Sequence, residues 1–108
     1  MPRLDFYINY IHQATIRLEE SEVLIGRDSK CALEIPDERV SRVHAVIRAS
    51  GEGHEVENRG TNGTKINGRK IEQPHNLQPG DAIFIGRYVM IYQPDDAPVA
   101  THASTVLD

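Results

Sequence analysis

Apolar residues along this chain come in short runs, most of them alternating with polar residues, between clusters of glycine, asparagine, aspartate and proline. Alternation with a period of two is typical of strands that bury one face. Eight segments have this character: residues 4–11, 14–18, 22–25, 44–49, 54–57, 65–66, 82–85 and 89–92. Residues 4–22, the one stretch long enough for a helix, also follow alternation better than a 3.6-residue period. The pattern therefore predicts an all-β fold.

Turn residues separate these segments and set the domain organisation. Asn62-Gly63 and Asn67-Gly68 are strong hairpin indicators, and turns recurring about every 8–12 residues favour a β-sandwich. After Gln93 the alternation stops, and the stretch from residue 94 to residue 98 has the Pro- and Asp-rich composition of a linker. We expect one domain over residues 1–93 and a flexible acidic C-terminal tail or linker over residues 94–108.

Charge and composition exclude several classes of function. The chain has 108 residues, with 12 Lys and Arg against 16 Asp and Glu, so it lacks the basic excess of a nucleic-acid-binding protein. No apolar run approaches the roughly 18 residues of a membrane span, and the N-terminus does not resemble a signal peptide, so we expect a cytoplasmic location. Cys31 is the single cysteine and the five histidines are scattered, so we expect no disulfide, metal or cofactor.

Three clusters of polar residues stand out against this background. They are Ile25-Gly26-Arg27, the run from Arg39 through Ser41 and Arg42 to His44, and the run from Gly60 to Gly68. They include three guanidinium groups, the Ser41 and Thr61 hydroxyl groups and the Asn62 carboxamide. Such a set suits a phosphate and the peptide attached to it, because guanidinium forks pair with oxyanions and a carboxamide can hold a peptide group.

Ser41 and His44 also raise the alternative of a hydrolase, with a serine nucleophile and a histidine base. No Gly-x-Ser-x-Gly elbow surrounds the serine, and no acid is evidently placed to orient the histidine. Residues three apart on a strand also point to opposite faces. We therefore expect no catalytic residue, and a structural role for His44.

Gly26-Arg27, then Ser41-x-x-His44, then Thr61-Asn62-Gly63-Thr64 and Asn67-Gly68, in this order, resemble the forkhead-associated (FHA) domain. The resemblance extends over the whole body of the chain. It implies a twisted antiparallel β-sandwich of about eleven strands whose loops at one end bind phosphothreonine peptides. It also implies a non-enzymatic protein–protein interaction module in Ser/Thr kinase signalling, whose partner is a phosphothreonine-containing protein, a kinase or its substrate. The alternative is a phosphate-independent interaction or oligomerisation module on the same fold.

The resemblance assigns roles to individual residues. The predicted phosphopeptide contacts are Arg27 and Ser41 to the phosphate, Arg42 beside it, Thr61 near the phosphorylated residue, Asn62 on the peptide main chain, and Arg39 near the phosphate or the third residue after it. The predicted loop-forming residues are Gly26, His44, Gly63, Asn67 and Gly68. Gly60 departs from the pattern, because relatives often have a serine there; the aspartate that they often have before Ile35 is also missing.

The tail suggests a ligand within the chain itself. Thr105 has an acidic residue, Asp108, three positions later, which Arg39 would suit. We hypothesise that phosphorylated Thr105, or less favourably Thr101, binds the site of a neighbouring chain.

Overall fold

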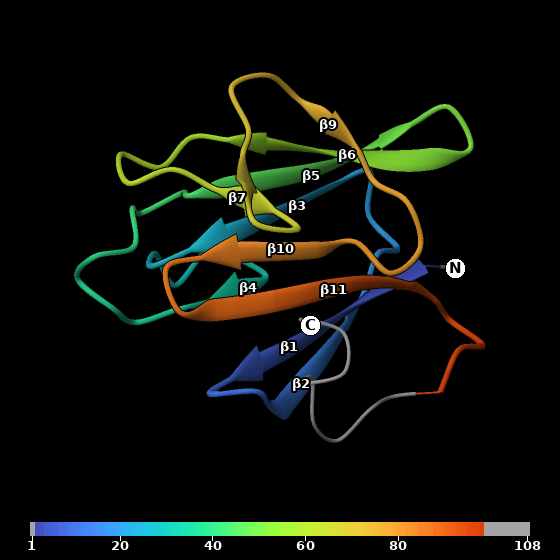
Figure 1. Ribbon diagram of the computed structural model, residues 1–108, viewed down its shortest axis with the longest axis horizontal. Coiled ribbons are helices and arrows are strands. Elements are labelled where there is room, and N and C mark those ends of the chain that lie inside the picture. Colours follow the sequence, from blue (N-terminus) through green and yellow to red (C-terminus); the bar gives the residue numbers. More distant parts are fainter. Residues whose placement is uncertain (1, 99–108) are drawn as a thin grey trace.

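The computed structural model describes residues 2–98 and contains eleven strands and no helix in that range (Figure 1). The strands are β1 (Pro2–Ile8), β2 (Ile11–Arg17), β3 (Glu22–Gly26), β4 (Leu33–Glu34), β5 (Ala45–Ser50), β6 (Gly53–Asn58), β7 (Lys65–Ile66), β8 (Arg69–Lys70), β9 (His75–Asn76), β10 (Ala82–Ile85) and β11 (Tyr88–Pro94). The predicted all-β fold is confirmed. Thr101 and Thr105 lie outside the described residues.

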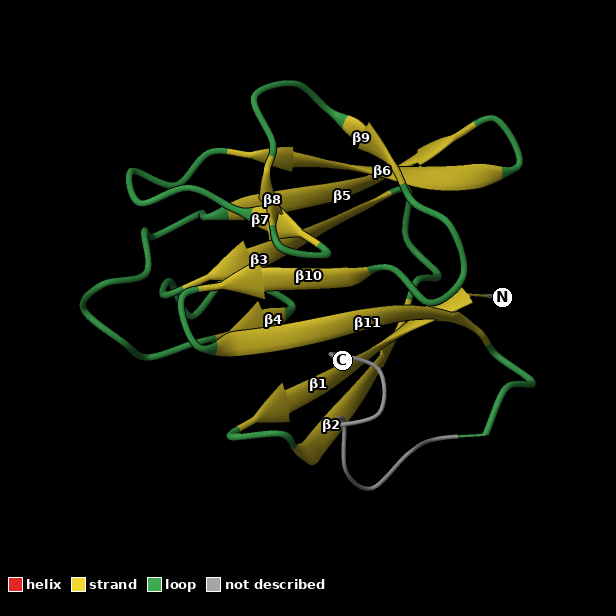
Figure 2. Ribbon diagram, in the orientation of Figure 1, coloured by secondary structure: helices red, strands yellow, loops and turns green. Residues whose placement is uncertain are grey.

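The strands form two sheets packed face to face (Figure 2). One sheet has six strands in the order β2-β1-β11-β10-β7-β8, and the other has five in the order β4-β3-β5-β6-β9. Every pair is antiparallel except β3 with β4, which run parallel. The predicted sandwich is thus present, with one parallel pair at the edge of the smaller sheet.

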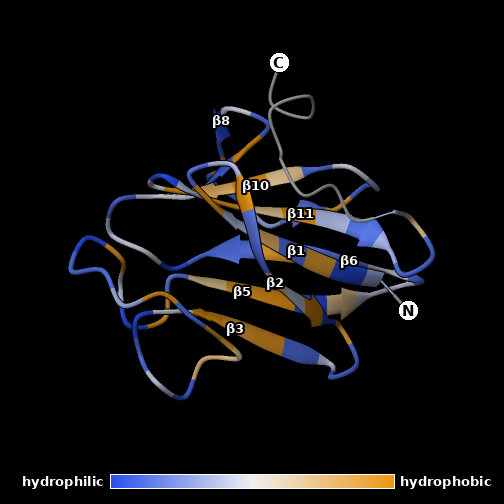
Figure 3. Ribbon diagram, turned by 90° about the horizontal axis from the view of Figure 1, so that it is seen from below, coloured by the Kyte–Doolittle hydropathy of each residue, from blue (hydrophilic) through white to orange (hydrophobic). Residues whose placement is uncertain are grey.

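The main core lies between the sheets and consists of the apolar residues of every second position (Figure 3). It includes Leu4, Ile25, Ile47, Val56, Ile83 and Met90, each fully buried. β1 and β11 are buried on both faces, since Tyr7, Ala82, Val89 and Ile91 form a smaller second cluster on the other side of the six-stranded sheet. Beside it, the buried Arg3 guanidinium pairs with Asp5 at 2.8 Å.

Two local predictions are wrong, and three strands were missed. Residues 4–11 do not form one strand, because the chain reverses at Asn9-Tyr10, and Ile8 pairs with Ile11 across that turn. His44 does not lie in a strand, because β5 begins at Ala45. Of the four two-residue strands, β7 was predicted, and β4, β8 and β9 were missed.

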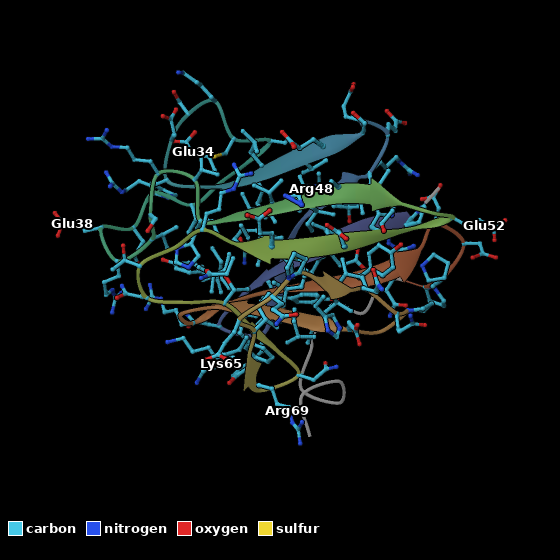
Figure 4. All side chains as sticks on the ribbon, turned by 90° about the horizontal axis from the view of Figure 1, so that it is seen from above. Glu34, Glu38, Arg48, Glu52, Lys65 and Arg69 are labelled. Carbon is cyan, nitrogen blue, oxygen red and sulfur yellow. The ribbon has the colours of Figure 1, made fainter. Side chains whose placement is uncertain are left out.

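Five connections share one end of the sandwich: β1–β2, β3–β4, β4–β5, β6–β7 and β10–β11, on the left in Figure 1. Glu38 on the β4–β5 connection and Glu52 on the β5–β6 turn mark opposite ends of the domain in Figure 4. All six predicted phosphopeptide contacts lie in the connections at the end marked by Glu38, namely β3–β4, β4–β5 and β6–β7. No helix that could cross a membrane occurs within residues 2–98.

Candidate functional site

The β3–β4 and β4–β5 loops meet through their backbones at the end of β3. The Arg27 N–H donates to the Ser41 carbonyl at 3.0 Å, and the Asp28 N–H donates to the Arg42 carbonyl at 3.1 Å. Gly26 permits this approach, because a Cβ at that position would lie 2.3 Å from the Arg42 carbonyl oxygen. The glycine therefore brings Arg27 next to Ser41 and Arg42.

His44 is fully buried, and its ring connects the β4–β5 loop to the β6–β7 loop. The Ser41 N–H donates to its Nδ1 at 3.0 Å, and its Nε2 lies 2.8 Å from the Gly63 carbonyl oxygen. Because Nδ1 accepts a hydrogen bond, the proton of a neutral imidazole sits on Nε2 and is donated to Gly63. The ring lies against Gly60, where a Cβ would come within 2.3 Å of it. A serine at position 60 would occupy the space that the imidazole fills here.

Ser41 and Thr61 face each other across the site. The Thr61 N–H donates to the Ser41 Oγ at 3.1 Å, so the Ser41 hydroxyl keeps its own hydrogen for another acceptor. Next to it, the Asn62 Nδ2 donates to the Arg39 carbonyl at 2.9 Å, which leaves the Asn62 Oδ1 as an acceptor. Thr61 and Asn62, in the β6–β7 loop, are both exposed.

Arg27 is held by its Nε, which donates to the Val40 carbonyl at 2.9 Å. Its two terminal nitrogens have no partner among residues 2–98, and the Arg42 side chain is also exposed nearby. The loops that carry the exposed Arg27 and Arg42 side chains, the Ser41 hydroxyl and the Thr61 side chain thus meet at one end of the sandwich. That set of donors can bind a dianionic phosphate.

Arg39 is exposed but already paired. Its guanidinium binds both carboxylate oxygens of Asp37, at 3.1 and 3.0 Å, and the Tyr88 hydroxyl donates to the same carboxylate at 2.7 Å. The Arg39 side chain and backbone N–H, together with Tyr88, hold the pKa of Asp37 well below its ordinary value. Arg39 therefore borders the site as half of an ion pair.

A groove of about 190 Å³ starts at Asn62 and Arg39 and reaches the β10–β11 turn at Arg87 and Tyr88. A second groove of about 500 Å³ is lined by Thr61 together with Lys70, Ile71 and Glu57. The first groove therefore includes Asn62 and the second includes Thr61, its neighbour in the β6–β7 loop.

Asp28, Asp37 and Asn58 were not predicted as site residues, and each shapes one of the three loops. The side-chain oxygen of each accepts the backbone N–H two residues later, at 2.8–3.0 Å. Asn58 also accepts the buried Thr64 hydroxyl at 2.8 Å. The sequence carries a signal for these turns, because aspartate and asparagine favour this bond at the start of loops.

The remaining predicted loop residues lie at tight turns. Gly63 and Gly68 have φ values of 85° and 89°, which glycine adopts without strain. The Asn67 side chain donates to the Asp81 Oδ1 at 3.0 Å and accepts the Ala82 N–H at 2.9 Å. Asn67 thus fixes the β7–β8 turn to the start of β10, outside the group formed by Arg27, Ser41 and Thr61.

Ser41 and His44 are not arranged as the nucleophile and base of a hydrolase. His44 Nε2 is engaged by Gly63, and Nδ1 accepts the Ser41 backbone N–H, so neither ring nitrogen is paired with the Ser41 hydroxyl. The two residues meet because residues 41–44 form a loop, which corrects the expectation that they face opposite ways. Within the described chain, no three His, Cys, Asp or Glu side chains gather as metal ligands.

Comparison with protein families supplies the deciding observation. Residues 23–86, more than half of the chain, match the model of the FHA domain. The chain belongs to the FHA domain family. FHA domains are protein–protein interaction modules that generally bind phosphothreonine peptides.

One curated relative is similar over part of its length. FraH from Nostoc sp. strain PCC 7120 is 47% identical over 53 residues, which are 46% of this chain and 18% of FraH. The chain therefore spans well under two thirds of that relative.

Two solved FHA structures match across most of both chains. One, from a structural and functional analysis of phosphothreonine-dependent FHA domain interactions, has a TM-score of 0.74 and 28% identity, and covers 90% of this chain and 99% of the other. The FhaA FHA domain, solved in complex with the intracellular domain of Rv3910, has a TM-score of 0.76 and 30% identity over 86% of this chain and 100% of its own.

Proposed function

We propose that this FHA domain binds phosphothreonine peptides through Arg27, Ser41, Arg42, Thr61 and Asn62. The observation that carries the proposal is the contact between loops, in which Ser41 accepts the Thr61 N–H at 3.1 Å while Arg27 bonds to the Ser41 carbonyl at 3.0 Å. These two bonds, the second of them from the Arg27 backbone N–H, join the loops that carry the Ser41 hydroxyl and the exposed Arg27 guanidinium. The Asn62 Oδ1 would then accept a main-chain N–H of the peptide.

The energetics suit a reversible interaction. A phosphothreonine brings about −1.5 to −2 charges, and each charge-assisted hydrogen bond contributes about 1.5–3 kcal/mol. Ordering a short peptide on an open surface offsets much of this gain, which leaves micromolar affinity, about −8 kcal/mol. The chain does no chemistry on its ligand in this proposal.

The biological setting follows from the ligand. A phosphothreonine is the product of a Ser/Thr kinase, so the partner is a phosphorylated substrate or the kinase itself. The site would act in the cytoplasm. The phosphothreonine-dependent interactions of one similar domain, and the protein complex of another, support a protein partner.

Three matched peptides test the proposal: one with phosphothreonine, one with phosphoserine and one with threonine, each drawn from an oriented library and measured by fluorescence anisotropy. We expect the wild-type chain to bind the phosphothreonine peptide best and Arg27→Ala to bind it at least about 10- to 100-fold more weakly. Arg69→Ala is the control, because Arg69 is exposed on β8, away from the site (Figure 4).

A phosphate-independent interaction module is the alternative on the same fold. It predicts equal binding of phosphorylated and unphosphorylated peptides, and an Arg27→Ala variant that binds as the wild type does. Either result would rule out the phosphothreonine proposal and leave the fold assignment unchanged.

A further inference from the structure

The β1–β2 turn presents two apolar side chains to solvent. Tyr10 is 50% exposed and Ile11 is 54% exposed, and they are the only large hydrophobic residues so exposed within residues 2–98. The rest of the described surface keeps such side chains covered. Two neighbouring side chains of this kind offer an apolar contact area to a partner.

Tyr10 has a backbone conformation that is unfavourable for a residue with a side chain. Asn9 and Tyr10 have φ values of 51° and 67°, so the two-residue turn has positive φ at both central positions. Such a turn favours glycine at its second position, because a Cβ crowds the following carbonyl there.

Another turn of this chain has glycine at that second position. The two-residue turn between β7 and β8 has Asn67 at φ 51° and Gly68 at φ 89°. The β1–β2 turn has the same asparagine but a tyrosine in place of the glycine. A strained residue whose side chain is half exposed gains little from the packing of its own domain, which points to a use outside the domain.

The turn adjoins the proposed phosphopeptide site. It lies at the same end of the sandwich as the β4–β5, β6–β7 and β10–β11 connections (Figure 1). Ile8, just before the turn, pairs with Tyr88, whose hydroxyl binds Asp37, the partner of Arg39. Tyr88 also lines the 190 Å³ groove that leads away from Asn62. The β1–β2 turn therefore lies beside the β10–β11 turn, where the groove from Asn62 ends.

We propose that Tyr10 and Ile11 anchor an apolar side chain of the phosphorylated partner, in the extended segment beyond the third residue after the phosphothreonine. This inference rests on the proposed function and extends it to a longer ligand. The tip lies two residues beyond Ile8, which is one strand spacing from Tyr88, and the Tyr88 side chain extends from there to Asp37 and Arg39. Together these lengths give on the order of 15 Å between the tip and Arg39, or about five extended residues. The ligand chemistry is a leucine, isoleucine or phenylalanine, because a tyrosine edge and an aliphatic chain offer contact area without charge.

A set of phosphothreonine peptides tests the inference by isothermal titration calorimetry. The short peptide ends at the third residue after the phosphothreonine, and the long peptide adds five serines. Further long peptides have a leucine at each added position in turn. We expect leucine at one or two of these positions to raise the affinity of the wild-type chain about 5- to 10-fold over the serine extension.

Tyr10→Gly and Ile11→Thr are the informative variants. Tyr10→Gly restores the favoured turn residue, so we expect its Tm to rise by about 2–6 °C while the gain from leucine disappears. Ile11→Thr keeps a β-branched residue in the strand and should also reduce the leucine effect. Both variants should bind the short peptide with the affinity of the wild type.

The outcomes separate this inference from the proposed function. If the short phosphothreonine peptide binds but leucine has no effect at any position, or its effect survives in Tyr10→Gly, the anchor is refuted and the phosphothreonine site stands. If no peptide binds in a phosphate-dependent way, both proposals fail. Loss of binding to phosphatidylglycerol vesicles in Tyr10→Gly, without any leucine effect, would assign the tip to a membrane surface instead and overturn the inference.

Discussion

A single imidazole joins two of the loops that form the proposed site. His44 accepts the Ser41 N–H and donates to the Gly63 carbonyl, at 3.0 and 2.8 Å, and it has no exposed surface to speak of. Removing the ring would leave a cavity and two backbone groups without their partners. His44 thus acts on ligand binding through the positions of Ser41 and Thr61, without contacting the ligand.

His44→Ala should therefore lower the free energy of unfolding by about 2–4 kcal/mol and weaken phosphothreonine binding. Asn at position 44 can replace the Nδ1 acceptor, and Gln can replace the Nε2 donor, so each should recover part of the stability. Urea denaturation of the three variants provides the measurement. Equal losses for Ala, Asn and Gln would contradict the hydrogen-bonding role and leave only the packing of the ring.

The close packing around Gly26 leads to a second prediction for a single residue. A Cβ there would lie 2.3 Å from the Arg42 carbonyl oxygen and 2.8 Å from that of Ser41, and backbone atoms cannot rotate away. We expect Gly26→Ala to destabilise the domain by at least about 2 kcal/mol and to separate Arg27 from Ser41. Gly53→Ala is the matched control, because the nearest atom to its Cβ would be the Tyr92 hydroxyl at 3.9 Å. Thermal unfolding should show a change within about 0.5 kcal/mol for the control.

Elements differ in how well the sequence predicts them. Long strands such as β3 and β5 follow from alternation between turn residues. The β1–β2 turn does not, because Phe6, Ile8 and Tyr10 keep alternating up to it and Asn9-Tyr10 lacks the glycine that marks such turns. The six contacts that the family resemblance predicts all lie in loops, as the turn residues around them indicate. Asp37 and Asn58 could not, since their roles depend on which backbone groups the folded loops leave without partners.

The ionised carboxylate of Asp81, just before β10, stabilises the β7–β8 turn through Asn67. Partial burial works to raise the pKa of Asp81, but hydrogen bonds from the Gln78 N–H, Asn67 and His75 outweigh burial and lower it. A carboxylate with a lowered pKa in the folded state adds stability above its unfolded pKa of about 3.9. That contribution is lost as the pH falls toward the folded value.

Asp81→Asn tests this element directly. At pH 7 we expect it to cost about 1–2 kcal/mol, because it removes charge-assisted bonds to the turn. The difference from the wild type should shrink as the pH falls below about 4, because Asp81 takes up a proton in the unfolded chain there and in the folded domain only at lower pH. Urea unfolding at pH 7, 5 and 3 measures it. A difference that stays constant over this range would show that the charge of Asp81 has no part in stability.

At the scale of the whole molecule, the direction of β11 decides how the tail can reach the site. β11 starts at Tyr88, beside the binding loops, and ends at Pro94 at the opposite end of the sandwich (Figure 1). Thr105 follows Pro94 by 11 residues, a maximum reach of about 36–40 Å. The domain is 32 Å long, so a return to the chain's own site would demand a nearly straight tail. The site of a second chain can be reached without that loss of conformational entropy.

Phosphorylation of Thr105 should therefore convert monomers into dimers or longer chains. Size-exclusion chromatography with light scattering on fully phosphorylated protein measures this, and mass spectrometry confirms the phosphorylated position. We expect the mass to rise with protein concentration, and Arg27→Ala to restore the monomer, since the same arginine would hold the phosphate of the neighbouring chain. Thr105→Ala separates this residue from Thr101. With micromolar affinity, association should be evident at about 100 μM; a monomer at that concentration with Thr105 fully phosphorylated would leave the domain's ligand to be found on another protein.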